Sequence, residues 1–238
     1  MHPVFLLTGC YFVVGGLAIA FISRRPGATG KAERWTKYAV YFLIVHFVIA
    51  AILSGAFFVV LAASILGLGV HEVVRAATTS AAGPVRTLAV VLPVYAGLGF
   101  AFIRFASGTR PSMILFVYVV VLTFDGFCQI TGQLLGRHKL VPRVSPGKTV
   151  EGLAGGLVMA LVTALPLAPW VGLGRANALA LALLAATSAL AGDLAASYLK
   201  RTCGVKDYAA WIPGHGGVLD RFDSFIAAGS VYWSLMGR

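Results

Sequence analysis

The sequence ANALALALLAATSALAGDLAASYLKR occupies residues 176–201 and joins an apolar run to a basic pair. The run from Ala176 to Ala196 is about as long as the 20 residues that a helix needs to cross a bilayer. A Lys-Arg pair ends the stretch, as expected where a span meets the polar interface. Asp193 is the exception, because it is a carboxylate inside the run. The stretch therefore predicts a membrane-spanning helix that carries one acid.

The composition extends this interpretation to the whole chain. Of its 238 residues, 59% are hydrophobic and only 11% are charged, with a mean hydropathy of +0.88. So few polar side chains cannot cover a water-soluble surface, and the chain is too apolar for disorder. The three cysteines, Cys10, Cys128 and Cys203, are too far apart in sequence to indicate a disulfide scaffold. We therefore expect an all-α, polytopic integral membrane protein.

The apolar segments predict about eight membrane spans. We place them at residues 3–23, 38–53, 56–71, 85–103, 112–136, 150–170, 176–199 and 222–237. The stretch 38–71 is ambiguous, since it could form one long tilted helix or two short helices broken near Ser54 and Gly55.

The basic residues decide between seven and eight spans through the positive-inside rule. With eight spans, fifteen of the nineteen Lys and Arg residues fall on one side of the membrane, in the loops 24–37, 72–86, 137–149 and 200–221. With seven spans the split becomes nine against ten. We therefore expect eight spans, with both termini outside and the basic loops in the cytoplasm, as in a bacterial inner (plasma) membrane protein.

The acids divide the chain into two regions. Six of the eight acids lie beyond residue 111: Asp125, Glu151, Asp193, Asp207, Asp220 and Asp223. We therefore separate an N-terminal region of apolar helices, residues 1–111, from a C-terminal region, residues 112–238, that carries the candidate chemistry.

Two of these acids lie inside predicted spans. A carboxylate in the membrane is costly unless it is paired, protonated or metal-bound. Asp193 is therefore a functional candidate, and the alternative is a salt bridge between packed helices or a protonated carboxyl near the interface. Asp125 begins a polar stripe with Gln129, Thr131 and Gln133, which faces either a water-filled cavity or a hydrogen-bonded neighbouring helix.

The segment 192–223 interleaves acids, bases and glycines. Asp220 and Asp223 are three residues apart at the start of the last span, so both lie on one helical face. Carboxylate oxygens are ligands for Mg²⁺, which also binds substrate phosphates, and Lys and Arg suit a polyphosphate. The turn 213–217 is small enough for its amides to approach phosphate oxygens. We interpret the segment as a site for a metal and a polyphosphate; a solvated charged loop is the alternative.

The loop 137–149 is more ambiguous. It ends in Gly-Lys-Thr like a P-loop, but that motif requires glycine at position 142, where this chain has Pro142. A P-loop also follows a strand, and we expect no strand here. Lys148 would contact phosphates if the loop forms a basic lid. Three polar residues could instead cap the helix that begins near residue 150: Ser145, Thr149 and Glu151.

Residues 197–223 carry a long run of motif residues with fixed gaps: Ser197, Lys200, Arg201, Lys206, Asp207, Ala209, Ile212, Pro213, His215, Gly216, Gly217, Val218, Asp220, Arg221, Phe222 and Asp223. This run resembles the signature of the phosphatidate cytidylyltransferase (CDP-diacylglycerol synthase) family. The helix 125–136 and the loop 145–152 are similar to two further stretches of that family. The helix departs from the family's Asp-Ser/Thr-Gly-Ala-Tyr start, because Gly-Phe-Cys-Gln follows its Asp. The N-terminal half matches only loosely, through residues 72–75.

The resemblance implies that the cytidylyl group of CTP is transferred to a lipid phosphate, phosphatidic acid, giving CDP-diacylglycerol and pyrophosphate. It implies Mg²⁺ at Asp193, Asp220 and Asp223, a second, monovalent cation such as K⁺ near the same acids, and a homodimer. We expect these three acids to be catalytic together with Lys206 and Asp207. Substrate contacts are expected from Asp125, Ser145, Lys148, Ser197, Lys200, Arg201, His215, Gly216, Gly217 and Arg221.

Two other functions remain open at this point. CTP-dependent lipid kinases of the polyprenol or phytol type resemble this family but transfer the γ-phosphate of CTP to an alcohol. A transporter or a non-catalytic scaffold would instead use Asp125 and Asp193 to line a permeation path. Basic loops beside membrane spans suit anionic lipid headgroups, so we expect the bilayer, and no nucleic acid, as the partner of this surface.

Overall fold

The computed structural model describes residues 3–24, 30–212 and 216–237 of the chain. Within these residues it contains eight helices and one two-stranded hairpin. The helices are α1 (Pro3–Ile22), α2 (Lys31–Leu53), α3 (Ala56–Ala77), α4 (Pro84–Gly108), α5 (Pro111–Leu135), α6 (Val150–Val171), α7 (Arg175–Thr202) and α8 (Leu219–Met236). The expected all-α bundle is confirmed, and each expected span coincides with one helix.

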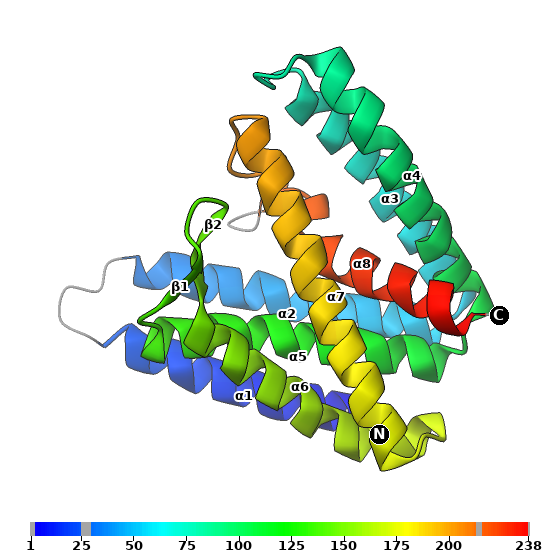
Figure 1. Cartoon of the computed structure of the whole chain (residues 1–238). Coiled ribbons are helices and arrows are strands. Elements are labelled where there is room, and N and C mark those ends of the chain that lie inside the picture. Colours follow the sequence, from blue (N-terminus) through cyan, green and yellow to red (C-terminus); the bar gives the residue numbers. More distant parts are fainter. Residues whose placement is uncertain (1–2, 25–29, 213–215, 238) are drawn as a thin grey trace.

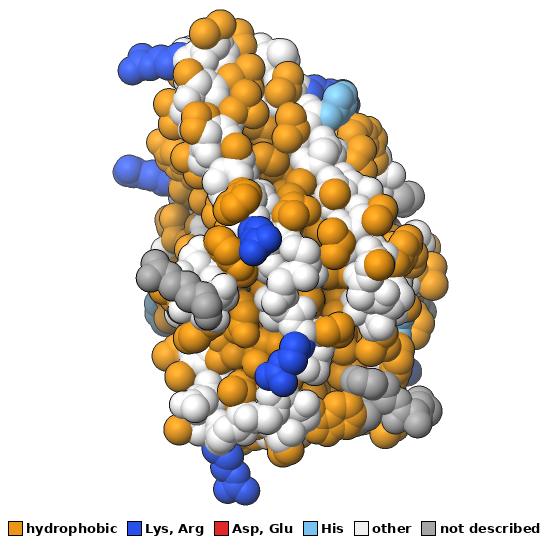
Figure 2. Space-filling view, turned by 90° about the vertical axis from the view of Figure 1, so that its right-hand side faces the viewer, with side chains coloured by type: hydrophobic (Ala, Val, Ile, Leu, Met, Phe, Trp, Pro, Cys, Tyr) orange, Lys and Arg blue, Asp and Glu red, His pale blue; other side chains and the backbone are white. Residues whose placement is uncertain are grey.

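Seven of these eight helices are long and apolar enough to cross a membrane, so the chain is an integral membrane protein. The helix α8 differs, because three charged residues occupy its first five positions: Asp220, Arg221 and Asp223. Figure 2 shows one outer face of the molecule, where hydrophobic side chains form most of the surface and Lys and Arg side chains are isolated. A surface this apolar is suited to contact with acyl chains rather than water.

The ambiguous stretch 38–71 forms two helices. The break between α2 and α3 falls at Ser54 and Gly55, as the two-helix alternative predicts. The backbone N–H and the hydroxyl of Ser54 both donate to the carbonyl of Ala51, at 3.1 and 2.9 Å. Gly55 follows with φ of 60°, which a residue with a Cβ rarely adopts. These two residues therefore end α2 and let the chain reverse direction.

The helix ends lie at two opposite ends of the bundle (Figure 1). The end of α1, the hairpin, the end of α7 and the end of α3 lie toward the upper left of the view, and the turns after α2, α4 and α6 lie toward the lower right. The helix ends alternate as they would for eight spans, and the eighth span stays a prediction because α8 is not among the seven apolar candidates. The basic segments therefore share one end of the bundle, and its assignment to the cytoplasm stays a prediction from the positive-inside rule.

A β-hairpin connects α5 to α6, so the expectation that this loop contains no strand is wrong. The strand β1 (Lys139–Val141) pairs antiparallel with β2 (Ser145–Thr149), with Lys139 opposite Thr149 and Val141 opposite Ser145. A three-residue strand is too short to leave an alternating pattern in the sequence. Ser145, one of the three candidate caps, pairs within the hairpin instead.

Both ends of the hairpin are attached to the start of α6. The hydroxyl of Thr149 accepts the backbone N–H of Gly152 at 3.1 Å, which confirms Thr149 as the N-cap. The carboxylate of Glu151 accepts the backbone N–H groups of Arg137 and His138 at 3.0 and 3.2 Å. Glu151 therefore holds the chain that enters the hairpin, while Thr149 holds the chain that leaves it.

The helices α5 and α6 share the most extensive helix–helix contact in the bundle. Glycine makes this contact possible: a Cβ on Gly152 would lie 2.6 Å from the carbonyl oxygen of Cys128 and 3.2 Å from the Cα of Gly132. A Cβ on Gly156 would lie 2.7 Å from the carbonyl oxygen of Phe124. Small residues of this kind let membrane helices approach backbone to backbone. We call this contact the glycine seam.

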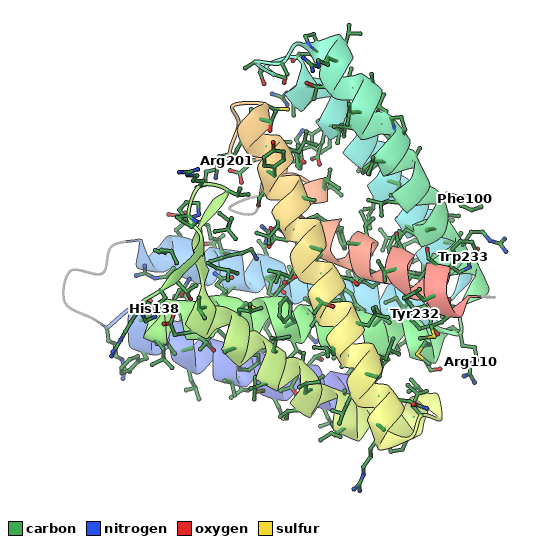
Figure 3. The ribbon with its side chains drawn as sticks, viewed as in Figure 1. Phe100, Arg110, His138, Arg201, Tyr232 and Trp233 are labelled. Atoms are coloured by element: carbon green, nitrogen blue, oxygen red, sulfur yellow. The ribbon has the colours of Figure 1, made fainter. Side chains whose placement is uncertain are left out.

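Aromatic side chains join α8 to α4 and α5. The ring of Phe225 in α8 lies 5.3 Å from that of Phe102 in α4 and 4.9 Å from that of Tyr118 in α5, between centroids. Toward the end of α8, the ring of Trp233 lies edge-on to that of Phe100 at 5.8 Å (Figure 3). These contacts bury one side of α8, and its charged first turn lies next to α7.

One buried acid holds the start of α8. Glu72 of α3 is fully buried, and its carboxylate accepts the backbone N–H groups of Val218 at 2.8 Å and Leu219 at 2.7 Å. A helix leaves these N–H groups without internal partners at its start, and a carboxylate there also interacts favourably with the helix dipole. A residue of the N-terminal region therefore determines where α8 begins.

We expect Glu72→Gln to destabilise the protein by about 1–3 kcal/mol, the cost of a buried hydrogen-bonding group that loses its partner. The amide oxygen can accept one N–H group, but the amide NH₂ would face the other, and the charge at the helix start is lost. Thermal unfolding in detergent, followed by circular dichroism, measures the effect. The matched control is Glu33→Gln, because Glu33 is exposed and pairs with Lys37 one turn away. Equal unfolding midpoints for the two variants would contradict the role assigned to Glu72.

Candidate active site

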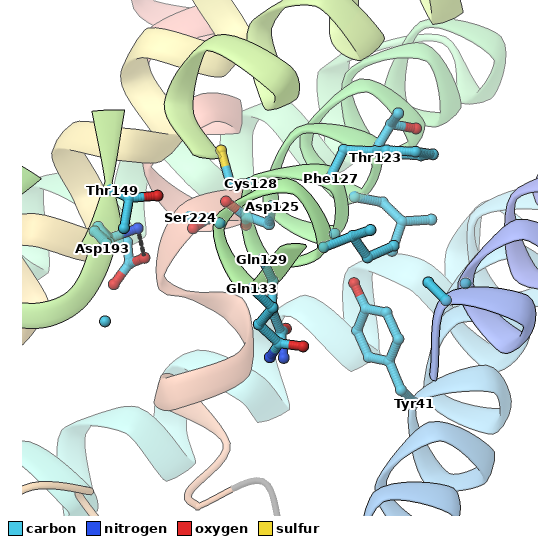
Figure 4. A pocket seen from close by; sticks show the side chains of 18 of the residues that line it. Tyr41, Thr123, Asp125, Phe127, Cys128, Gln129, Gln133, Thr149, Asp193 and Ser224 are labelled. Carbon is cyan, nitrogen blue, oxygen red and sulfur yellow. Dashed lines mark ion pairs between the residues drawn. The ribbon is translucent and has the colours of Figure 1, made fainter. Parts of the chain in front are cut away.

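A cavity of about 820 Å³ is lined by side chains from α1, α2, α5, the hairpin, α6, α7 and α8. Asp125, Gln129 and Gln133 of α5 lie along it (Figure 4), which confirms that the polar stripe faces a cavity. Thr131, the fourth member of the stripe, is different, because its side chain lies against Gly155 of α6. Most of the polar stripe of α5 therefore forms a cavity wall.

Four acids line this cavity, and three of them come from three different helices: Asp125 of α5, Asp193 of α7 and Asp223 of α8. Their carboxylates are near enough to interact electrostatically with one another. Ser224 also hydrogen-bonds to Asp125, and Figure 4 shows Asp125, Asp193 and Ser224 around the same space. Like charges held this close repel unless a cation or a ligand compensates them. The fold therefore concentrates negative charge from three distant segments in one place.

Lys148 of β2 compensates part of that charge. Its Nζ lies 2.5 Å from Oδ2 of Asp193, and the hydroxyl of Ser197 donates to Oδ1 of the same carboxylate at 3.2 Å. Burial alone would lower the pKa of Lys148, but the charge and hydrogen bond of Asp193, with a further contribution from Asp125, outweigh it and raise the pKa above its ordinary value. Lys148 is therefore a cation at neutral pH, as a phosphate contact must be.

Asp220 has a different environment from Asp223, although both begin α8. The carboxylate of Asp220 accepts hydrogen bonds from Nζ of Lys200 at 2.6 Å and from the backbone N–H groups of Tyr208 and Gly217 at 2.9 and 2.8 Å. Its side chain is only 2% exposed. None of the ion pairs among the described residues involves Asp223. Asp220 therefore holds the segment before α8, and Asp223 is left to face a ligand.

The glycine turn before α8 folds around Asp220. Gly216 has φ of +79°, and a Cβ there would lie 2.8 Å from the carboxylate oxygen Oδ2 of Asp220. The amide of Gly217, expected to approach a phosphate, donates to the same carboxylate. His215 lies outside the described residues. Burial and the nearby Asp223 and Asp220 carboxylates raise the pKa of Tyr208, so its hydroxyl stays neutral beside this turn.

The other expected contacts fall into two groups. Four of them line the cavity: Ser145, Lys148, Lys200 and Arg221. Arg201 instead lies near the hairpin (Figure 3), with Nε 3.3 Å from the carbonyl oxygen of Val144, so it ties α7 to the hairpin. Lys206 and Asp207 are exposed and are not among the residues that line the cavity. Their catalytic role stays a prediction.

The sequence pattern does not identify the opposite wall of the cavity, which α1 and α2 provide. Six polar side chains lie on it: Thr8, Tyr11, Arg34, Lys37, Tyr38 and Tyr41. The positive-inside argument uses the two bases only for orientation. Four of these residues occupy positions i, i+3, i+4 and i+7 of α2, and polar side chains at that spacing form one face of a helix. That periodicity is the signal by which they could be found.

The acids of the cavity have the donor chemistry for a hard divalent cation. Among the described residues, no three His, Cys, Asp or Glu side chains are arranged around a common metal position. One or two carboxylates suffice for Mg²⁺ when substrate phosphates and water supply the remaining ligands. Asp193 and Asp223 can fill that role, and they share the cavity with Lys148 and Arg221.

Comparison with known proteins places the chain among its relatives. A family model described as "Cytidylyltransferase family" matches residues 4–237. The chain belongs to the cytidylyltransferase family. It is 42% identical over 134 residues to a protein named phosphatidate cytidylyltransferase from Staphylococcus saprophyticus, a match that covers 56% of this chain and 52% of the relative. Proteins of the same name from Staphylococcus haemolyticus and Staphylococcus aureus are 39% and 38% identical over 134 and 135 residues. The chain thus spans about half the length of the curated relatives it matches.

In this member of the cytidylyltransferase family, three separate segments meet at the cavity. The helix 125–136 contributes Asp125, the loop 145–152 contributes Lys148, and the segment 197–223 contributes Lys200 and Asp223. These are the segments in which the sequence resembles the family. These four expected site residues therefore converge even though they come from different segments of the chain.

The two acids at the start of α8 are expected to respond differently to neutralisation. Asp220→Asn leaves the Lys200 ammonium buried without its partner, so we expect a loss of about 3 kcal/mol in the free energy of unfolding, the lower end for a broken buried ion pair. Asp223→Asn removes a charge that faces the cavity, and we expect unfolding like that of the wild type. Urea unfolding of each variant in mixed micelles measures both. A larger loss in the free energy of unfolding for Asp223→Asn than for Asp220→Asn would contradict the structural role assigned to Asp220.

Proposed function

We propose that the protein transfers the cytidylyl group of CTP to a lipid phosphate, phosphatidic acid, giving CDP-diacylglycerol and pyrophosphate. The observation that carries the proposal is the cavity in which Asp125, Asp193 and Asp223 meet Lys148 inside a membrane protein of the cytidylyltransferase family. The name phosphatidate cytidylyltransferase, borne by relatives that match over half their length, supports the choice of acceptor.

The chemistry requires two anionic reactants to meet. An oxygen of the lipid phosphate attacks the α-phosphorus of CTP, a new P–O bond forms, and the bond to pyrophosphate breaks with its electron pair leaving on pyrophosphate. The attacking phosphate is ionised at neutral pH, so no strong general base is needed. Catalysis then rests on in-line positioning and on cations that offset repulsion. Lys148 and Arg221 are placed for that task in the cavity.

The resting ion pair between Lys148 and Asp193 suggests how a substrate enters. Both side chains are only partly buried, 19% and 27% exposed, so an incoming phosphate can take over the ammonium. Asp193 is then available to a metal, and Asp193 and Asp223 are the residues that would hold Mg²⁺. Bound there, Mg²⁺ would neutralise charge on the phosphates. The monovalent cation, the homodimer and the cytoplasmic position of the cavity mouth are further predictions that accompany this function.

Product analysis tests the proposal. Purified protein in phosphatidylcholine nanodiscs is incubated with CTP, Mg²⁺ and a panel of diacyl, ether and isoprenoid lipid phosphates and alcohols, and the products are identified by mass spectrometry. We expect pyrophosphate and a CDP-lipid, formed from phosphatidic acid in preference to the other acceptors. CDP with a newly phosphorylated lipid alcohol would indicate a kinase, and solute flux without CTP consumption would indicate a transporter.

We expect Asp193→Asn to lower kcat by about a hundredfold or more, the order of magnitude for loss of a group that supports transition-state charge, while the protein remains folded and membrane-inserted. Lys148→Ala should raise the KM for CTP. Arg86→Gln serves as the control because Arg86 is exposed and lies outside the cavity. Wild-type turnover by Asp193→Asn would remove that residue from the mechanism, and unchanged KM and kcat in Lys148→Ala would do the same for Lys148.

A further inference from the structure

The cavity has a second charged region, away from the three acids. All four acids that line the cavity belong to α5, α7 and α8: Asp125, Asp193, Asp220 and Asp223. The wall formed by α2 and β1 contributes bases instead, namely Arg34, Lys37 and Lys139. Neither Arg34 nor Lys139 takes part in any ion pair among the residues that the structure describes. This region of the cavity therefore has three bases and no carboxylate among its described lining residues.

Arg34 has unused hydrogen-bonding capacity. Its Nε donates to the hydroxyl of Ser23 at 3.2 Å. Its Nη2 is buried and, among the described residues, has no hydrogen-bond partner. A buried donor without an acceptor is unfavourable, and the cost is larger for a charged group. An acceptor supplied by a ligand in the cavity would remove that cost.

Two neighbouring bases can act on the same ligand. Lys37 follows Arg34 by three residues, so the two side chains share one face of α2. Nζ of Lys37 lies 2.6 Å from Oε1 of Glu33, with the two side chains 41% and 68% exposed. A solvent-accessible pair of this kind is weak and easily exchanged. Lys139, which is exposed on β1, lines the same cavity. A planar guanidinium with flanking ammonium groups matches a phosphate dianion or a polyphosphate.

Arg34 and its neighbouring bases line the same cavity as the acids but lie at a distance from them. Tyr41 follows Arg34 on α2 by seven residues, which is about 10 Å along a helix axis. Tyr41 interacts electrostatically with Asp125 and Arg221, so it lies beside the acid cluster. A phosphate at Arg34 would therefore lie roughly 10 Å from that cluster, as the far end of a substrate bound in the same cavity.

We propose that Arg34, with Lys37 and Lys139, forms a phosphate-binding subsite at the α2 end of the cavity. The subsite rests on the proposed function for its ligand, which is a phosphate of one of the two substrates. The phosphate belongs either to the lipid headgroup or to the distal phosphates of CTP, and both have the same recognition chemistry.

Direct binding tests the subsite independently of turnover. Wild-type protein and Arg34→Gln are reconstituted in phosphatidylcholine nanodiscs, and the Kd is measured for radiolabelled CTP by equilibrium dialysis and for a fluorescent phosphatidic acid by titration. Arg34→Lys, which keeps the positive charge but loses the planar guanidinium, is a second variant. Arg86→Gln is the matched control, since Arg86 is exposed at the start of α4 and outside the cavity.

We expect Arg34→Gln to raise the Kd for one of the two ligands, CTP or phosphatidic acid, by about tenfold, as loss of one charge-assisted hydrogen bond does. The rise in Arg34→Lys should be smaller. A rise for CTP alone assigns the subsite to the nucleotide, and a rise for phosphatidic acid alone assigns it to the lipid. Unchanged affinity for both ligands, or an equal loss in Arg86→Gln, would overturn the subsite. If wild-type protein binds both ligands but forms no CDP-lipid, the proposed function fails while the binding result still decides the subsite.

Discussion

The contact between the Glu72 carboxylate and the first N–H groups of α8 sets the geometry on which the cavity depends. A helix turns by about 100° per residue. If α8 began one residue earlier or later, Asp223 would rotate out of the cavity and the aromatic face of α8 would leave α4. Glu72 belongs to α3, in the region with few acids. The N-terminal helices therefore help to set the orientation of the acids as well as to span the membrane.

The cavity accounts for a small part of the net charge of +11 that this apolar chain carries. Six bases and four acids line the cavity, and two of the acids are already paired, Asp193 with Lys148 and Asp220 with Lys200. The first pair is partly open to solvent and exchangeable, whereas the second is buried and structural. The remaining positive charge is balanced once an anionic ligand is present. The excess of bases is thus consistent both with membrane orientation and with phosphate-bearing substrates.

The sequence predicts those features that depend on local chemistry. Apolar length identifies the spans, Gly55 marks the break between α2 and α3, and Thr149 is recognisable as a cap. It also marks Asp125 and Asp193 as functional candidates, because an acid within a span needs a special environment. Features that depend on packing between distant segments are not predictable in this way.

The two acids of α8 illustrate that limit. Helical periodicity places Asp220 and Asp223 on one face. It does not reveal that Lys200 and two backbone amides donate hydrogen bonds to the carboxylate of Asp220. The basic wall at Arg34 is hidden for the same reason, since it becomes part of the cavity only when α2 packs beside α5.

The glycine seam has a mechanical consequence for Lys148. The hairpin leaves two helices whose backbones touch, so it stands on a stiff base, and exchanging a carboxylate for a phosphate needs only a side-chain rotation. Little entropy is lost when a substrate docks on a site this preorganised.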